Sequence, residues 1–238
     1  MDGNGRWAER RGLSRPAGHR AGAEALRRVV EAAPDLGVGT LTAYAFSSDN
    51  WSRPRPEVDA LMGLLDGYLR SETGRLRRAG VRLQLIGRRD RLPGRLRAAA
   101  ARAEWETRAG TRLCLRLAVD YSARWALSQA AARLAASGDL GCPSATSASG
   151  PTGGETAVAA FDTALAGVLH PGGAPAPPVD LVVRTGGEQR LSDFLLWESA
   201  YAELLFLDTP WPDVTGDTLG DAVAAFRQRS RRFGGLAA

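Results

Sequence analysis

The sequence predicts an α/β fold, with one domain in which a central, mostly parallel β-sheet is flanked by helices. Short apolar runs alternate along the 238 residues with segments of helical periodicity, the pattern of parallel strands joined by helical crossovers. No internal repeat or clear linker divides the chain, so residues 1–238 are expected to form a single domain. A chain of this length buries enough surface to need no disulfide or metal for stability.

Five apolar runs predict the strands. The first is rich in Thr, Tyr and Phe, which favour a pleated strand. The third alternates apolar and polar residues around Cys114, and the fourth is a short run typical of a buried parallel strand. In chain order, the expected strands are 40–46, 81–86, 112–119, 179–183 and 204–207.

Apolar positions three and four residues apart predict the helices. Pro34 and Gly37 end the first helix, Pro56 begins a long one and Gly80 follows its end. A stretch of Ser, Gly, Ala, Thr and Pro at 137–154 predicts a flexible surface loop. The expected helices are 21–33, 56–79, 93–108, 125–135, 155–169 and 218–231.

Composition excludes several classes of function. All 31 basic residues are arginine, so neither a Schiff-base lysine nor a Walker A lysine is present. The two cysteines lack the spacing of a zinc site and fit a reducing, cytoplasmic setting. A net charge of +5 is modest, and no nucleic-acid partner is expected. No apolar run is long enough to span a membrane, and no signal peptide is expected.

The first seven residues place a carboxylate, two glycines, an amide and an arginine side by side. Glycine leaves backbone N–H groups uncovered, and a guanidinium donates to phosphate oxygens. A carboxylate beside groups that bind phosphate is best explained as a ligand of a Mg²⁺ ion that is itself bound to the diphosphate. The alternative is an ordinary turn, since Asp-Gly and Asn-Gly are common turn dipeptides. The residues concerned are Asp2, Gly3, Asn4, Gly5, Arg6 and Trp7.

A second candidate site follows the strand expected at 179–183. Arg184, Arg190 and Ser192, with a glycine pair between them, would lie at the carboxyl end of that strand, where open α/β sheets bind ligands. These groups suit a second diphosphate, and Glu203 could supply a further carboxylate for a metal. The alternative is a loop with a surface salt bridge.

Two further groups of residues are candidates for the same edge of the sheet. Ser47, Asn50, Trp51 and Arg53 follow the strand expected at 40–46, although a capped turn before a helix would look similar. Arg15 and His19 precede the first helix, where anions are attracted. A lone histidine is more often structural than catalytic, so both interpretations stand for His19.

Together these motifs resemble the cis-prenyltransferases, the undecaprenyl diphosphate synthase family. The resemblance runs almost from end to end, through several long motifs in the same order. The matching segments are 1–8, 15–22, 44–54, 184–192, 201–204 and 231–235. It implies a Mg²⁺-dependent enzyme that condenses isopentenyl diphosphate with an allylic prenyl diphosphate to give a Z-polyprenyl diphosphate. It also implies an apolar tunnel for the growing chain and a cytoplasmic homodimer.

The resemblance also implies roles for individual residues. Asp2 would hold Mg²⁺ and assist departure of the allylic diphosphate, with Glu203 near the metal. Asn50 and Ser47 would assist condensation and proton loss, and Arg232 and Gly234 would contact the partner subunit. Isopentenyl diphosphate would be bound by Arg184, Arg190 and Ser192. The residues expected to bind the allylic substrate are Gly3, Asn4, Gly5, Arg6, Trp7, Arg15, His19, Trp51 and Arg53.

The chain departs from the family pattern at several positions. Asp49, Gln189 and Asp120 stand where relatives commonly carry glutamate, histidine and asparagine. The strand that relatives have just before the aspartate motif is missing, and we expect the true start to lie upstream of Met1. Irregular head-to-middle coupling and a non-catalytic partner subunit of the same fold are the alternatives. Neither product length nor the preferred allylic substrate can be predicted.

A run of basic residues predicts one more partner. Nine arginines lie between Arg75 and Arg97, against a single acidic residue, Asp90. Most clusters of this kind are solvated faces of the protein. Because a prenyl product must reach a membrane, peripheral contact with an anionic membrane surface is the alternative.

Overall fold

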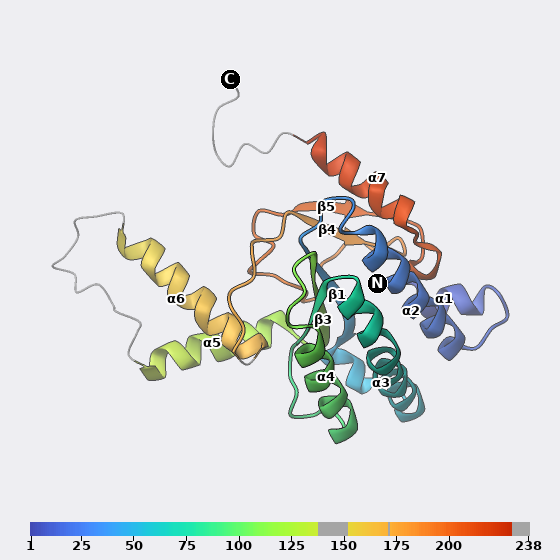
Figure 1. The fold of residues 1–238 in the computed structure, drawn as a ribbon, viewed down its shortest axis with the longest axis horizontal. Helices are drawn as coiled ribbons and strands as arrows, with labels where there is room; N and C mark the ends of the chain where they lie inside the picture. The colour runs from blue at the N-terminus through green and yellow to red at the C-terminus, as the bar shows by residue number, and fades with distance from the viewer. Residues whose placement is uncertain (138–151, 171, 230–238) are drawn as a thin grey trace.

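Parallel strands and helices alternate along the chain in the computed structural model, which describes residues 1–137, 152–170 and 172–229 (Figure 1). The strands are β1 (Thr40–Ser47), β2 (Val81–Ile86), β3 (Leu113–Tyr121), β4 (Leu181–Arg184) and β5 (Glu203–Phe206). The α-helices are α1 (Asn4–Glu9), α2 (Arg15–Ala32), α3 (Arg55–Arg78), α4 (Gly94–Thr107), α5 (Ala123–Ser137), α6 (Thr152–Leu169) and α7 (Gly216–Arg227). Two 3₁₀ helices are η1 (Ser48–Ser52) and η2 (Trp211–Asp213).

All strand pairs in the described residues are parallel, as predicted. β3 lies between β1 and β2, and β4 pairs separately with β5. Leu115 of β3 is opposite Leu41 on one side and Leu83 on the other. No strand of the described residues joins the two ladders.

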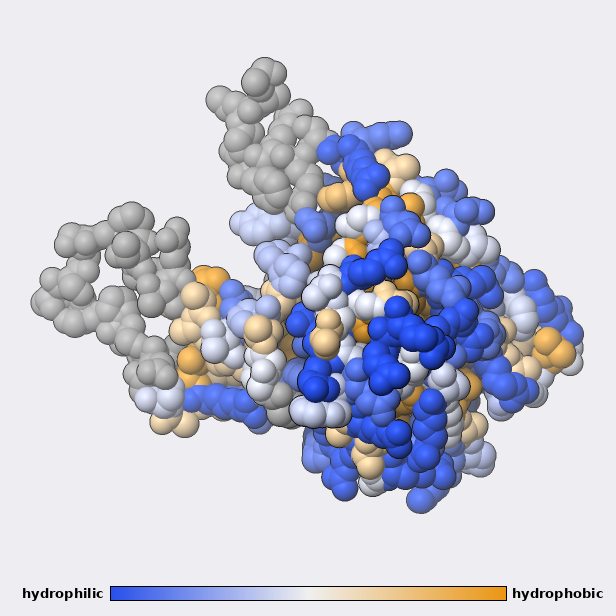
Figure 2. Space-filling view, in the orientation of Figure 1, coloured by the Kyte–Doolittle hydropathy of each residue, from blue (hydrophilic) through white to orange (hydrophobic). Residues whose placement is uncertain are grey.

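Helices cover both faces of the three-stranded sheet (Figure 1). One core cluster combines Leu83, Leu115 and Leu117 with the apolar residues of α2, α3 and α4. A second cluster combines Ile86 and Ala118 with the apolar residues of α5 and α6. Hydrophilic residues dominate the surface over α3 and α4 (Figure 2). The prediction of a single-domain α/β fold with flanking helices is confirmed.

The start of the chain differs from the prediction, because α1 is a short helix and α2 begins at Arg15 rather than at residue 21. Gly3 has a φ of 91°, a left-handed conformation that glycine adopts at little cost, and the helix follows it directly. α1 packs closely on α2, since a Cβ on Gly18 would lie 2.2 Å from the Asn4 carbonyl oxygen. Tertiary packing therefore turns the expected turn into a helix.

Several other boundaries differ from the prediction by a few residues, among them those of α5, β3 and β4. Of the loop expected at 137–154, residues 138–151 lie outside the described part, and the last three residues belong to α6. The last helix ends at Arg227, earlier than residue 231. None of the described helices combines the length and the apolar composition needed to cross a bilayer.

Candidate active site

The opening segment of the chain meets the segment that follows β4. The backbone N–H of Asp2 donates to Thr185 Oγ1 over 3.0 Å, and Arg184 Nη2 donates to Asp2 Oδ2 over 3.0 Å. Two motifs 182 residues apart in sequence are therefore in contact, as predicted. Thr185, which is buried, is not among the predicted residues, and its position directly after Arg184 is the only signal the sequence offers.

Asp2 is held as a carboxylate. Partial burial raises its pKa, but hydrogen bonds from Arg184 and from the Gly3 N–H outweigh burial and bring the pKa below its ordinary value of 3.8. The Gly3 N–H donates to Asp2 Oδ1 over 2.6 Å. Both carboxylate oxygens thus have partners, and Asp2 is ionised at neutral pH.

Arg184 also organises the loop that follows it. Its Nη1 donates to Ser192 Oγ over 2.7 Å and to the carbonyl oxygen of Arg190. Arg190 in turn pairs with Glu188, which lies 3.4 Å from Arg6 Nη1. We call Asp2, Arg6, Arg184, Arg190 and Ser192 the first cluster. Three of its five side chains are arginines, so the cluster is suited to binding an anion.

A second cluster surrounds Glu57 in the first turn of α3. Arg53 Nη1 lies 3.1 Å from this carboxylate, Arg15 Nε lies 3.4 Å away and His19 Nε2 lies 3.5 Å away. We call Arg15, His19, Arg53 and Glu57 the second cluster. Sequence reasoning missed Glu57, although its position four residues after Arg53 on a helix start is a signal for an ion pair.

Burial and neighbouring charged groups set the protonation states of Glu57 and His19 in the second cluster. Burial raises the pKa of Glu57, but Arg15 and Arg53 outweigh burial and keep the pKa below its ordinary value. Burial lowers the pKa of His19, more than Glu57 raises it. His19 Nε2 makes no hydrogen bond within the described residues, so an uncharged imidazole is available to a ligand oxygen.

α1 lies between the two clusters. A Cβ on Gly5 would lie 2.9 Å from the Arg15 guanidinium, which would have to shift to make room for it. Arg6, the next residue, extends instead toward Glu188, which pairs with Arg190 of the first cluster. A Cβ on Gly22 would lie 2.5 Å from Asn4 Oδ1, so the Asn4 side chain is packed against α2. The absence of side chains at Gly5 and Gly22 therefore lets α1 and α2 pack closely.

The 3₁₀ helix η1 places Ser47, Asn50 and Trp51 at the carboxyl end of β1. Asn50 Oδ1 accepts a hydrogen bond of 3.1 Å from the Ser47 N–H, which caps the turn. The Trp51 ring packs edge-on against Phe46 with ring centroids 5.2 Å apart, and its buried Nε1 lacks a partner among the described residues. The capped turn that one interpretation predicted is present, and it carries the residues that the other interpretation assigns to a site.

Two predicted residues, Trp7 and Glu203, lie elsewhere. The Trp7 indole donates to Asp213 over 2.6 Å and stacks beneath Arg11, outside both clusters. Glu203 is three residues from the end of the β4–β5 ladder that Arg184 occupies, about 10 Å along the strand, and it pairs with Arg229. Their proposed roles stay predictions, as do those of Arg232 and Gly234, which lie outside the described residues.

Asp2 is the residue best suited to hold a metal ion. No cluster of three acidic, histidine or cysteine side chains occurs in the part of the chain that the structure describes. Mg²⁺ does not need one, because it commonly binds through one or two carboxylates and the phosphates of a substrate. An ionised Asp2 between arginines that attract phosphate fits that mode, and the role of Glu203 near the metal stays a prediction.

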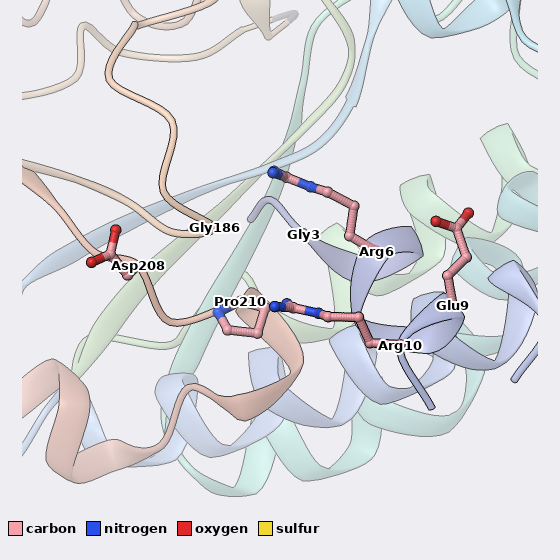
Figure 3. Close-up of a pocket in the computed structure, with 7 residues that line it drawn as sticks. All are labelled: Gly3, Arg6, Glu9, Arg10, Gly186, Asp208 and Pro210. Carbon is pink, nitrogen blue, oxygen red and sulfur yellow. The ribbon is translucent and has the colours of Figure 1, made fainter. Parts of the chain in front are cut away.

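Two cavities adjoin these clusters. The first, of about 280 Å³, lies beside α1, where Arg6 and Arg10 extend toward Gly186 and Pro210 with Asp208 opposite (Figure 3). The second, of about 90 Å³, begins at His19 and Asn4 and continues between apolar residues of α2, β1 and α3. Its apolar lining includes Leu26, Ala45, Phe46, Leu61, Met62 and Leu65. An anionic head and an apolar tail could therefore be bound side by side.

Comparison with known proteins identifies the family. The family model described as "Putative undecaprenyl diphosphate synthase" matches residues 1–234. The chain belongs to the undecaprenyl diphosphate synthase family. It is 54% identical over 238 residues to "Isoprenyl transferase 1" of Bradyrhizobium diazoefficiens, covering 100% of this chain and 88% of that relative. It is 44% identical to the isoprenyl transferase of Caulobacter vibrioides, covering 100% of this chain and 86% of the relative.

Solved structures of this prenyltransferase family share the fold. Lavandulyl diphosphate synthase from Lavandula x intermedia, in complex with dimethylallyl diphosphate, is 32% identical with a TM-score of 0.85, covering 98% of this chain and 95% of that one. A probable undecaprenyl diphosphate synthase from Campylobacter jejuni is 30% identical with a TM-score of 0.73, covering 90% and 92%. The predicted resemblance is confirmed, and the chain is a member of a prenyltransferase enzyme family.

Proposed function

We propose that this chain is a Mg²⁺-dependent cis-prenyl elongation enzyme. It condenses isopentenyl diphosphate with an allylic prenyl diphosphate to give a Z-polyprenyl diphosphate. The observation that carries the proposal is the ionised Asp2 carboxylate, held by Arg184 where the opening segment meets the loop after β4. Membership of the prenyltransferase family supports the same reaction class.

Each cluster is proposed to bind one diphosphate. The second cluster binds the allylic diphosphate together with Gly3, Asn4 and Gly5, because His19 and Asn4 line the apolar cavity that would hold a prenyl tail. The first cluster binds isopentenyl diphosphate through Arg184, Arg190 and Ser192. The bound dimethylallyl diphosphate of the solved relative, which is an allylic diphosphate, supports this class of substrate.

The reaction breaks the allylic C–O bond, forms a C–C bond to the terminal alkene carbon of isopentenyl diphosphate and releases a proton. Negative charge grows on the departing diphosphate, so donors fixed in advance around it stabilise the transition state most. Arg15, His19 and Arg53 are placed to donate to it. Mg²⁺ bound by Asp2 would supply further neutralisation of the same charge. Asn50 and Ser47, fixed by their mutual hydrogen bond, orient the second substrate for proton loss.

The apolar cavity is proposed to be the start of the product tunnel. It lies between α2, β1 and α3 and is lined mainly by Leu, Met, Ala and Phe side chains. A cationic or allylic intermediate is protected there from water, which would otherwise capture it. Growth of the prenyl chain requires the neighbouring side chains of α3 to move apart, because a cavity of about 90 Å³ holds only a few carbon atoms.

Purified protein given farnesyl or geranyl diphosphate, isopentenyl diphosphate and Mg²⁺ tests the proposal. Longer diphosphates should form, and EDTA should abolish the reaction until Mg²⁺ is restored. Asp2→Ala should abolish it as well, with binding of isopentenyl diphosphate retained because Arg190 and Ser192 remain. Full activity of Asp2→Ala would refute the assigned role of this carboxylate.

Coupling of two allylic diphosphates is the second candidate function. The observation that favours it is the solved relative, a lavandulyl diphosphate synthase with an allylic diphosphate bound. The same protein supplied with dimethylallyl diphosphate alone separates the candidates. Elongation requires isopentenyl diphosphate and gives no product in this assay, whereas irregular coupling gives a branched product.

We also propose that the enzyme is a homodimer. Trp197, Tyr201 and Leu204 expose large apolar surfaces on and just before β5, the edge of the second ladder. Exposed apolar groups gathered at a sheet edge mark a protein interface. The pairing would bring Arg232 and Gly234 of one subunit toward the site of the other, as the family resemblance implies.

We also propose that the enzyme is cytoplasmic and that the ends of α3 and α4 contact an anionic membrane surface. The last turn of α3 carries three arginines, and both helices lead into neighbouring parallel strands, so their ends lie on the same side of the sheet. Trp105 of α4 is 64% exposed with the Arg108 guanidinium 3.5 Å from its ring centre. Trp and Arg are typical of residues that contact the membrane interface. Sedimentation with anionic but not zwitterionic vesicles, weakened by salt and by Trp105→Ala, tests this contact.

A further inference from the structure

Asp120 is a completely buried carboxylate near the end of β3, at the edge of the sheet where the site lies. It is 0% exposed, and its φ of 49° is a left-handed conformation that is uncommon outside glycine. Arg91 binds both of its oxygens, with Nε donating to Oδ2 over 2.8 Å and Nη2 donating to Oδ1. Removing one partner of a buried ion pair is strongly destabilising, because the remaining charge is then buried without compensation.

Ser48 is the second residue bonded to this carboxylate and supplies its third hydrogen bond. Its Oγ donates to Asp120 Oδ1 over 3.0 Å. Ser48 is the first residue of η1, the 3₁₀ helix that carries Asn50 and Trp51. The Arg91 guanidinium also lies 5.6 Å from the centre of the Trp51 ring, so Arg91 contacts η1 directly. The ion pair is therefore bonded at one end to the element that carries the predicted catalytic amide.

Arg91 itself is fixed by the loop between β2 and α4. The N–H of Arg88 in this loop donates to the Asp120 carbonyl oxygen over 3.2 Å. A Cβ on Gly87 would lie 2.3 Å from the Val119 carbonyl oxygen, so the loop can approach β3 this closely only with glycine there. Three strand ends, those of β1, β2 and β3, are joined at Asp120.

We propose that Arg91 and Asp120 are positioning residues that hold η1, and with it Asn50, in place for the condensation step. The inference rests on the proposed function, because Asn50 acts only in that reaction. Neither residue touches a substrate in this assignment. Ser48 transmits their hold, since its hydroxyl makes the hydrogen bond between η1 and the buried carboxylate. A displacement of Asn50 by about 1 Å is enough to slow a reaction by about a hundredfold.

Three substitutions test the positioning role. Ser48→Ala removes the link and leaves the ion pair intact, so it should fold normally. Arg91→Ala removes the ion pair. Arg91→Lys keeps a positive charge at this position but lacks the paired N–H groups that bind both oxygens of Asp120. Arg88→Lys is the matched control, because the Arg88 side chain pairs with exposed Asp90 and makes no hydrogen bond to Asp120. Thermal midpoints identify any variant that fails to fold.

Steady-state kinetics provide the first readout. Ser48→Ala and Arg91→Ala should lower kcat at least about tenfold, with KM for the allylic diphosphate changed less than about twofold. Arg91→Lys should recover part of kcat, and Arg88→Lys should match the wild type. A wild-type kcat in folded Ser48→Ala and folded Arg91→Ala would overturn the proposal. So would a fall in kcat that Arg88→Lys reproduces.

A second readout does not depend on activity. With fluorotryptophan incorporated, the ¹⁹F resonance of Trp51, assigned by its loss in Trp51→Phe, should shift or broaden in Ser48→Ala and Arg91→Ala. An unchanged Trp51 resonance in both variants would overturn the positioning role. Failure of the proposed function looks different: the wild type would then form no product, while the Trp51 resonance would still respond to the substitutions.

Discussion

At the scale of single residues, two carboxylates hold the cationic groups of the candidate site. Asp2 is bonded to Arg184, and Glu57 lies within 3.5 Å of Arg15, His19 and Arg53. Each carboxylate keeps arginine side chains in place before a diphosphate arrives. Side chains oriented in advance lose less entropy when the ligand binds.

Arg53 and Arg190 are predicted to serve different substrates. Arg53→Ala should raise KM for the allylic diphosphate, and Arg190→Ala should raise KM for isopentenyl diphosphate, because each removes a charge-assisted hydrogen bond worth about 1.5–3 kcal/mol. The corresponding change is roughly tenfold to a hundredfold. Initial rates with each substrate varied in turn measure both constants. A rise in the same KM for both variants would contradict the assignment of one cluster to each substrate.

The sequence predicts the arginines of the site and misses the contacts that hold them. Only the pairing of Glu57 with Arg53, four residues earlier, could be inferred from the sequence, because Arg15 and His19 of α2 reach Glu57 only in the folded chain. Trp7 shows the converse: it belongs to the opening motif, but its indole is bonded to Asp213. Residue type indicates which group can bind phosphate, whereas orientation depends on tertiary packing.

At the scale of elements, strands were easier to predict than helix starts. The strand predicted at 81–86 forms β2 with the same bounds, because a short apolar run between a helix end and a glycine has few other solutions. α1 was missed, since Gly3 and Gly5 indicate a turn when taken alone. Its formation depends on Gly18 and Gly22 of α2, which allow the close approach of Asn4.

β1 and α3 are predicted to set the length of the product. Ala45 of β1 lines the apolar cavity, so Ala45→Leu adds carbon atoms where the prenyl tail would pass. The variant should retain the first condensations and release shorter products than the wild type. Reversed-phase chromatography of dephosphorylated products measures the change. An unaltered length distribution in an active Ala45→Leu enzyme would exclude this cavity as the tunnel.

Glu104 of α4 is predicted to make the free energy of unfolding depend on pH in the acid range. Burial raises its pKa, but hydrogen bonds from His170, Arg89 and the Leu85 N–H outweigh burial and lower the pKa from 4.5 to about 2. The charge thus contributes stability above pH 4.5, which is lost as the pH falls toward 2. Breaking such a half-buried pair with Glu104→Gln should cost about 3 kcal/mol at pH 7.

Denaturant unfolding at pH 7, 4.5 and 3 measures this effect. The difference in unfolding free energy between wild type and Glu104→Gln should shrink as the pH falls below 4.5. Glu106→Gln, on the same helix, is the matched control, because Glu106 pairs only with Arg102 at the surface. A difference that is constant with pH would show that the Glu104 charge does not contribute.

At the scale of the whole molecule, β5 is predicted to form the subunit interface. Leu204 is 39% exposed, and a charge there would be unfavourable at a buried apolar contact. Leu204→Glu should give a monomer with reduced activity and an unchanged thermal midpoint at low concentration. Light scattering after size-exclusion chromatography measures the mass. A Leu204→Glu dimer as stable as the wild type would place the interface elsewhere.

The overall architecture follows from the sequence because alternation of apolar runs and helical segments leaves few arrangements other than a parallel sheet with helices on both faces. The division of that sheet into two ladders is less predictable. Asp2 follows directly on Met1, yet it is hydrogen-bonded to Thr185 and to the Trp211 N–H. The start of the chain therefore joins the candidate site beside the segments that follow β4 and β5, a contact that only the fold reveals.

The most direct test of the account is the mass spectrum of the dephosphorylated product formed from an unlabelled allylic diphosphate and ¹³C-labelled isopentenyl diphosphate with Mg²⁺. Condensation at Asp2 and Arg184 predicts a series of polyprenols in which every added five-carbon unit carries the label, and no such series with Asp2→Ala. A product without label, built only from allylic units, or a full labelled series from Asp2→Ala, would contradict it.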